Sequence, residues 1–123
     1  MRQSIRTVEA PVPAGPYSQA VRAGDFLYVS GQVPRQADGT YEAAGVASET
    51  RLTLRNLEVI VRAAGGRLTD SVKITAYLAD GADFAEFNRA YAEFFDDTPP
   101  ARTTVVAGLR QVKVELDAVV YLG

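Results

Sequence analysis

The chain has 123 residues and a formal net charge of −2, with 47% hydrophobic and 23% charged residues. These values are typical of one soluble globular domain, so we expect a single domain over residues 1–123. The sequence has no cysteine and no histidine, which excludes disulfides, thiolate catalysis and every catalytic triad built on histidine. A pI near 5.1 argues against binding nucleic acid through bulk charge.

No stretch approaches the roughly 18 apolar residues of a membrane span, and the N-terminus lacks the basic and apolar pattern of a signal peptide. We therefore expect a cytoplasmic protein with no membrane partner. The acidic residues are scattered singly apart from Asp96 and Asp97, which we interpret as a solvated helix end. No calcium-loop motif occurs, so we predict no metal site.

The N-terminal part of the chain predicts strands separated by turns. Residues 1–9 and 18–22 are strand candidates, joined by an ordered loop at 10–16 whose three prolines exclude a helix or a central strand. Residues 26–30 are apolar on both alternating faces, which predicts a strand covered on both sides. Gly31 follows that strand and permits another group to approach the backbone closely.

The middle of the chain predicts helix, strand and helix. Apolar residues recur with helical spacing from Val46 to Ala64, and Gly65 is placed to end that helix in the left-handed conformation. Residues 72–78 alternate as a strand, with Val72, Ile74, Ala76 and Leu78 on its core face. The spacing of Asp83 and Glu86 resembles a capping box, and we expect the second helix to bury a stripe formed by Phe84, Phe87, Tyr91 and Phe94.

The C-terminal part predicts two further strands, at 101–107 and 112–122. The resulting fold class is α+β, with one sheet backed by two helices. A four-residue loop at 108–111 would join the last two strands as a hairpin. That register would place Arg102, Thr104, Glu115 and Asp117 on one face, with Arg102 and Glu115 as diagonal neighbours roughly 7–8 Å apart at their Cα atoms.

An arginine beside a hydroxyl and a carboxylate on one strand face is suited to binding a substrate carboxylate and orienting a water. The alternative interpretation of the same geometry is a solvated cross-strand ion pair, worth about 0–1 kcal/mol.

Seven short motifs follow one another in the chain. The first three are Gly15–Ala20, Ser30–Gln32 and the helical segment Asn56–Gly66. The other four are Val72–Thr75, Phe84–Asn88, Pro100–Thr103 and Val112–Glu115. In this order and at this spacing, from about Pro13 to Leu122, the chain resembles the RidA family (YjgF/YER057c/UK114) of enamine/imine deaminases.

The resemblance implies a chorismate-mutase-like fold of βββαβαββ order and a homotrimer with active sites between adjacent subunits. It also implies hydrolysis of 2-imino and 2-enamino acids, such as 2-aminoacrylate, to 2-keto acids and ammonia. Members of the family need no cofactor, which agrees with a chain that lacks histidine and cysteine.

The resemblance also assigns roles to residues of this chain. Arg102 matches the arginine that binds the substrate carboxylate, and Glu115 matches the glutamate near the imine. Tyr17, Ser30, Gly31 and Asn88 match residues that line the cleft. Thr104 stands where many members have a cysteine, so thiol chemistry is excluded at this substrate-binding position. The loop before Glu115 is shorter than in the best-known members, which we expect to alter the cleft rim.

Three alternative functions remain open. The first is an endoribonuclease or translation inhibitor, against which the net charge of −2 and the absence of histidine argue. The second is a non-catalytic trimer that binds carboxylate ligands through Arg102. The third, chorismate mutase, rests on fold analogy alone. The apolar residues Phe26, Tyr28, Val119 and Tyr121 are candidates for burial by cyclic association of copies.

Overall fold

The computed structural model describes all 123 residues. The strands span Arg2–Ile5 (β1), Ala20–Ala23 (β2), Phe26–Gln32 (β3), Ser71–Leu78 (β4), Ala101–Val106 (β5) and Val114–Tyr121 (β6). The helices span Val46–Ala63 (α1) and Phe84–Ala92 (α2), and short 3₁₀ turns at Leu68–Asp70 and Gly81–Asp83 precede β4 and α2. This order confirms the predicted α+β fold of βββαβαββ type.

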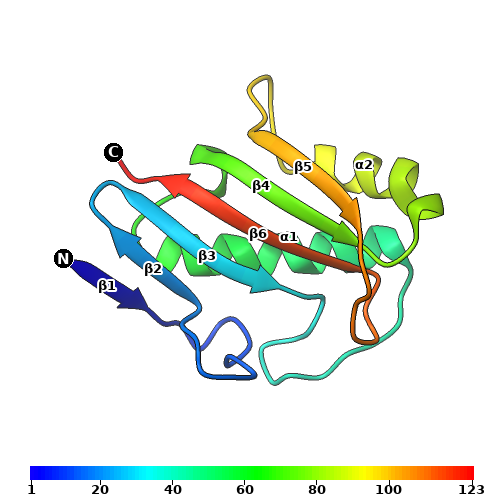
Figure 1. The fold of residues 1–123 in the computed structure, drawn as a ribbon, viewed down its shortest axis with the longest axis horizontal. Coiled ribbons are helices and arrows are strands. Elements are labelled where there is room, and N and C mark those ends of the chain that lie inside the picture. The colour runs from blue at the N-terminus through cyan, green and yellow to red at the C-terminus, as the bar shows by residue number, and fades with distance from the viewer.

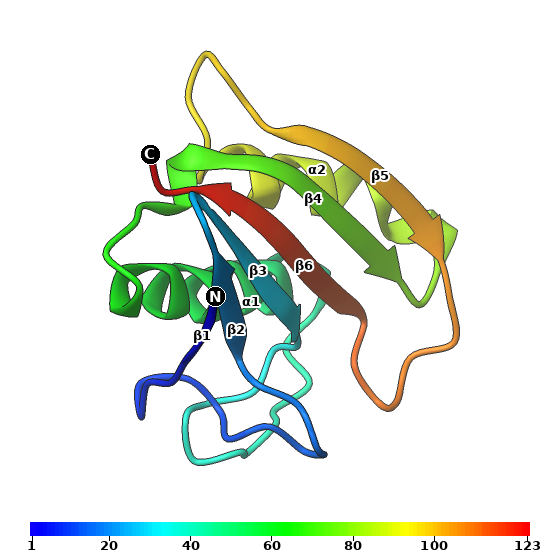
Figure 2. The same ribbon diagram turned by 60° about the vertical axis from the view of Figure 1, so that its left-hand side comes forward.

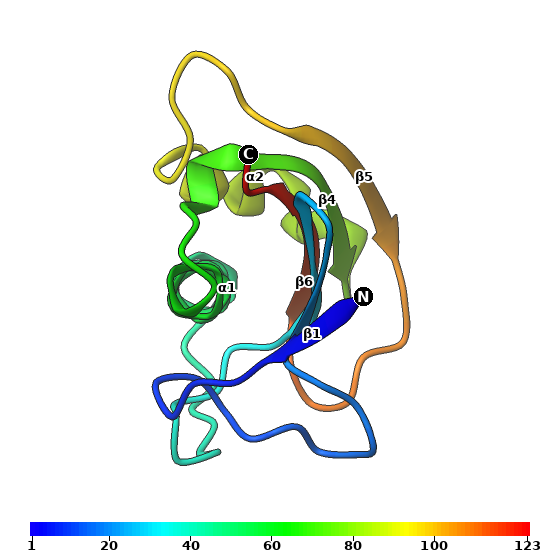
Figure 3. The ribbon, with the colours of Figure 1, turned by 90° about the vertical axis from the view of Figure 1, so that its left-hand side faces the viewer.

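The six strands form one sheet in the order β1-β2-β3-β6-β4-β5 (Figure 1). Only the β4–β5 pair is parallel, and α2 provides the crossover between these strands because a tight turn cannot join parallel neighbours. Both helices lie on one side of the curved sheet, and no helix lies on the other side (Figure 3). One face of the sheet is therefore covered by the chain itself and the other is not.

The predicted hairpin between the last two strands is wrong. β6 lies between β3 and β4, whereas β5 lies at the sheet edge and pairs with β4 alone. The connection between them loops past the end of β4 (Figure 2), where the Ala107 N–H donates to Leu78 and the Ala79 N–H donates to Lys113. The physical reason is burial: alternate residues of β6 are fully buried, which suits a central strand, whereas β5 is mostly exposed.

The hydrophobic core lies between the helices and the helix side of the sheet. α1 buries its apolar stripe completely, at Leu54, Leu57, Ile60 and Val61. The helix ends as predicted, with Gly65 in the left-handed region at φ +85°. Neither helix combines the length and the apolar character that crossing a bilayer requires.

Three local predictions need correction. Phe84 is 46% exposed because it is the first residue of α2, at the rim of the sheet. The carboxylate that caps this region belongs to Asp80, which accepts from the Ala82 N–H, and Asp83 makes no capping bond. Val72 is 43% exposed because the pairing of β4 with β6 shifts register between Ser71 and Lys73. Ser71 is therefore buried in place of Val72.

Candidate active site

Arg102 projects from the edge strand β5 toward helix α2. It pairs in register with the buried Ile74, so its side chain lies on the helix side of the sheet. There its Nη2 donates to Asn88 Oδ1 at 2.7 Å, and its guanidinium carbon lies 4.7 Å from the ring centre of Tyr91 and 5.2 Å from that of Phe87. Aromatic faces attract a cation, so α2 holds the guanidinium in place with an amide and two rings.

A groove of about 540 Å³ opens beside this guanidinium. Its polar lining comes from Arg102, Asn88, Tyr91 and Asp96, and the rest of its lining comes from Ala92, Phe95, Pro99 and Pro100. The ion pairs of the chain involve Arg51, Arg62 and Arg67 but not Arg102. The charge of Arg102 is thus not neutralised within the chain, which suits a site for an anion.

Glu115 occupies the other side of the sheet. It pairs with Tyr77 in β4 and alternates with the buried Val114 and Leu116, so its carboxylate points away from the helices. On the other neighbouring strand, the register of β3 shifts between Val29 and Gln32. A bulge of this kind re-aims side chains and disrupts regular pairing.

Gly31 lies in this bulge, directly against the Glu115 carboxylate. A β-carbon built on residue 31 would collide with Glu115 Oε2 and lie 3.1 Å from its carboxyl carbon. The close approach predicted for Gly31 is therefore confirmed, and the group that approaches is the Glu115 carboxylate.

The Glu115 carboxyl group is half-buried and has no hydrogen-bond or ion-pair partner in the chain. Burial, and then the negative charge of Asp117, raise the pKa of Glu115 above its ordinary value. Asp117 itself accepts a hydrogen bond from the Tyr77 hydroxyl at 3.1 Å. A carboxyl group in this state is suited to exchanging a proton with a bound ligand or water.

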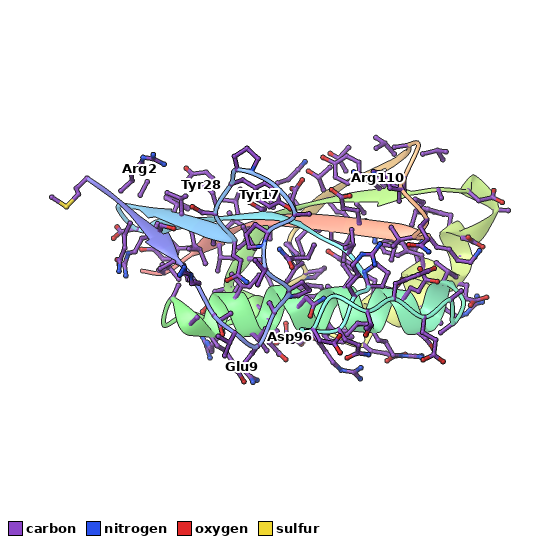
Figure 4. The ribbon with its side chains drawn as sticks, turned by 90° about the horizontal axis from the view of Figure 1, so that it is seen from below. Arg2, Glu9, Tyr17, Tyr28, Asp96 and Arg110 are labelled. Carbon is purple, nitrogen blue, oxygen red and sulfur yellow. The ribbon has the colours of Figure 1, made fainter.

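Tyr17 and Ser30 lie on the loop and strand next to Gly31. The Tyr17 ring is half-exposed and, like Tyr28, lies on the helix-free side of the sheet, whereas Asp96 lies on the helix side (Figure 4). A small hollow of about 90 Å³ has both Tyr17 and Gly31 in its lining. The Ser30 hydroxyl donates to the Ser18 carbonyl at 2.6 Å, so it also anchors the loop that carries Tyr17.

The predicted residues therefore fall into two groups on opposite faces. Arg102, Asn88 and Thr104 belong to the helix side, and Tyr17, Gly31 and Glu115 belong to the helix-free side. Ser30 precedes Gly31 in β3, and its hydroxyl is bonded to the Ser18 carbonyl. The prediction that Arg102 and Glu115 are diagonal neighbours on one face is wrong, because β5 and β6 are not paired. Each pairs with β4 instead: Arg102 lies opposite Ile74 and Glu115 lies opposite Tyr77, and these two β4 residues face opposite sides of the sheet.

Sequence reasoning missed a buried carboxylate that supports the second group. Glu49 of α1 is 2% exposed, and it accepts hydrogen bonds from the Tyr41 hydroxyl (3.0 Å) and the Lys113 N–H (2.9 Å). These bonds tie the loop after β3 and the start of β6 to the helix. One sequence signal could have identified Glu49: it is a single acidic residue on the apolar stripe of the predicted helix.

Comparison with known proteins adds to this geometry. Residues 7–122 match the family described as Endoribonuclease L-PSP. A RutC family protein of Pyrococcus horikoshii is 43% identical over 98% of this chain and 98% of its own. An Escherichia coli protein named "Putative reactive intermediate deaminase TdcF" is 40% identical over 97% of this chain and 96% of its own.

Solved structures agree with these sequence matches. The crystal structure of E. coli TdcF with bound serine has a TM-score of 0.91 and 38% identity, covering 97% of this chain and 98% of that one. The structure of RidA from a Psychrobacter species has a TM-score of 0.91 and 36% identity, with the same coverage. The chain belongs to the RidA family, whose members are also described as Endoribonuclease L-PSP proteins.

Proposed function

We propose that this protein hydrolyses 2-imino and 2-enamino acids, such as 2-aminoacrylate, to 2-keto acids and ammonia. The observation that carries the proposal is the unneutralised Arg102 guanidinium, which Asn88 and the rings of α2 hold beside a groove. A guanidinium in a fixed position binds a carboxylate through two hydrogen bonds, which a lysine would not reproduce. The name of the TdcF relative supports the same reaction class.

The proposed reaction needs a positioned water and a proton carrier. An enamine first takes a proton at carbon and gives up one from nitrogen, and so becomes the imine. Water then adds to the C=N carbon while one of its protons passes to the nitrogen. The resulting carbinolamine transfers its hydroxyl proton to the amino group, and ammonia leaves as the C–N bond breaks and the C=O bond forms. Glu115, with its raised pKa and free carboxyl oxygens, is the group we assign to orient the water and carry the proton.

One copy of the chain does not bring these groups together, because Arg102 and Glu115 lie on opposite faces of its sheet. We therefore propose a cyclic homotrimer in which Arg102 of one copy faces Tyr17, Gly31 and Glu115 of the next. The helix-free face supports this assembly: it exposes Phe26, Tyr28 and Tyr121, which association between copies would bury.

The first test is a coupled assay with 2-aminoacrylate, generated from serine by a dehydratase, in which pyruvate formation is followed. We expect the wild-type protein to accelerate pyruvate release, the Arg102→Ala variant to have no effect, and the control variant Arg62→Ala to behave like wild type. Arg62 is an exposed residue of α1 that pairs with Glu58 at 3.5 Å. Equal activity of Arg102→Ala and wild type would contradict the proposal.

The second test asks whether two copies share a site. Arg102→Ala and Glu115→Ala chains are each expected to be inactive. When the two are mixed and reassembled, every mixed cyclic trimer regains one intact site, so random mixing restores roughly a quarter of the wild-type activity. Complete inactivity of the mixture, with trimers present in sedimentation, would show that the two residues act within one copy or not in one site.

The family description also names an endoribonuclease. The arginines of α1 give little support to RNA binding here, because Arg51 pairs with Glu93 at 2.8 Å and Arg62 pairs with Glu58. Incubation with single-stranded RNA is the matching assay: cleavage that Arg102→Ala leaves intact would identify a second activity elsewhere on the chain. Ligand binding without turnover would instead favour a carboxylate-binding trimer.

A further inference from the structure

Within the chain, the Tyr91 hydroxyl is the only buried side-chain polar atom that makes no hydrogen bond. Tyr91 lies in α2 and is 6% exposed. Leaving a buried hydroxyl without a partner is costly, and native proteins satisfy nearly all such groups. An isolated exception therefore needs an explanation.

The surroundings of Tyr91 are apolar on one side and cationic on the other. Its ring lies 5.5 Å from that of Phe87 and 4.8 Å from that of Phe95, and the guanidinium carbon of Arg102 lies 4.7 Å above it. Asn88 is three residues earlier on the same helical face and accepts a hydrogen bond from Arg102. All three polar residues line the groove, and so does Asp96.

The chemistry of these groups selects the charge of a ligand. Burial raises the pKa of Tyr91 to about 12, whereas the charge and the N–H groups of the neighbouring Arg102 act to lower it. The phenol therefore stays protonated at neutral pH and its O–H can donate. Arg102 has no acidic partner. A neutral donor beside an unneutralised guanidinium favours an anionic oxygen and disfavours a cation.

We propose that Tyr91 is a binding residue of the Arg102 site, and that its hydroxyl donates a hydrogen bond to the carboxylate held by Arg102. The site then contacts the carboxylate from two side chains, with Asn88 orienting the guanidinium. The identification of the anion as a carboxylate rests on the proposed function. The Tyr91 hydroxyl without a partner in the chain and the Arg102 guanidinium beside it are features of the chain itself.

The experiment compares binding and stability in the same variants. The probe is 2-oxobutanoate, a stable 2-keto acid, titrated by calorimetry into the wild-type protein, Tyr91→Phe and the control Arg62→Ala, whose residue is exposed on α1 and pairs with Glu58. Phenylalanine keeps the shape of the ring, so Tyr91→Phe is expected to fold. It should bind the probe roughly tenfold to a hundredfold more weakly, because it loses one hydrogen bond to a charged group.

The melting temperature distinguishes this role from a structural one. Because Tyr91→Phe removes a buried hydroxyl that has no partner in the chain, we expect its melting temperature to equal or exceed that of the wild type. Unchanged probe binding, or a clear drop in melting temperature, would overturn the proposal, as would a wild-type protein that does not bind the probe. If Tyr91→Phe weakens binding but the wild type hydrolyses no imine, the binding role stands and the deaminase proposal fails.

Discussion

Gly31 and Glu115 meet on the helix-free face of the sheet so closely that a β-carbon on residue 31 would collide with the Glu115 carboxylate. This contact joins the bulge of β3 to the central strand β6 and sets the position of the one carboxyl group we assign to proton transfer. The relationship leads directly to a substitution that tests that assignment.

Gly31→Ala is expected to reduce imine hydrolysis at least roughly tenfold while changing stability by less than about 1 kcal/mol. The added methyl group meets the mobile end of a side chain, so Glu115 can swing away without disturbing the backbone. The coupled assay and thermal unfolding measure the two effects. Gly108→Ala is the matched control, since a β-carbon there meets open space, and full activity of Gly31→Ala would argue against a role for the Glu115 position.

Glu115→Gln is expected to change how stability depends on pH. Because the folded-state pKa of Glu115 lies above its ordinary value of 4.5, the folded protein binds more protons than the unfolded chain in that range. The contribution of Glu115 to stability is therefore greatest below pH 4.5 and is lost as the pH rises through the raised pKa.

The measurement is the melting temperature of both proteins between acidic and neutral pH. Glutamine cannot ionise, so the stability of Glu115→Gln relative to wild type should increase as the pH rises. The exposed Glu42→Gln serves as the control and should follow the wild-type curve. Parallel curves for Glu115→Gln and wild type would contradict the raised pKa.

Asn88→Asp is expected to weaken binding of 2-oxobutanoate more than Asn88→Ala does. The amide oxygen of Asn88 accepts from Arg102 at 2.7 Å, so an aspartate there would place a competing carboxylate on the same guanidinium. Calorimetric titration of both variants measures the difference, which we expect to be roughly tenfold or more. Equal affinities for the two variants would mean that the charge of Arg102 does not hold the ligand.

Glu49→Ala is expected to destabilise the protein by about 2–4 kcal/mol in urea unfolding at neutral pH. The substitution leaves the Lys113 N–H without its acceptor and frees the Tyr41 hydroxyl, and it opens a cavity beneath the start of β6. Glu42→Ala, at an exposed position of the same region, should change stability little. A loss below about 1 kcal/mol would show that water replaces the carboxylate at little cost.

Local patterns in the sequence predicted most of the individual elements. The helical spacing of Leu54, Leu57 and Val61 identified α1, and Gly65 ended it as expected. The alternation from Val112 to Leu122 identified β6, which spans Val114–Tyr121, because a buried strand face and a buried helix stripe have different periods. These features depend on neighbours in the chain, so composition and spacing suffice to find them.

Pairing between distant strands was not predictable in the same way. The short connection after β5 suggested a hairpin, but β6 inserts between β3 and β4 and leaves β5 at the edge. A loop of given length permits either path, and the choice depends on which strand pairs along both edges and buries one face completely, as β6 does. The error reversed the facing of Arg102 relative to Glu115, since a strand places alternate residues on opposite faces.

The sequence by itself determined the fold class, the resemblance to the RidA family and the residue types available for chemistry, because these follow from local periodicity and from motifs in order. Only the tertiary structure decided that Arg102 joins Asn88 and Tyr91 on the helix side, and that Gly31 receives Glu115 on the other. Those contacts join segments far apart in the chain, and strand order and side-chain burial, which no local pattern records, bring them together.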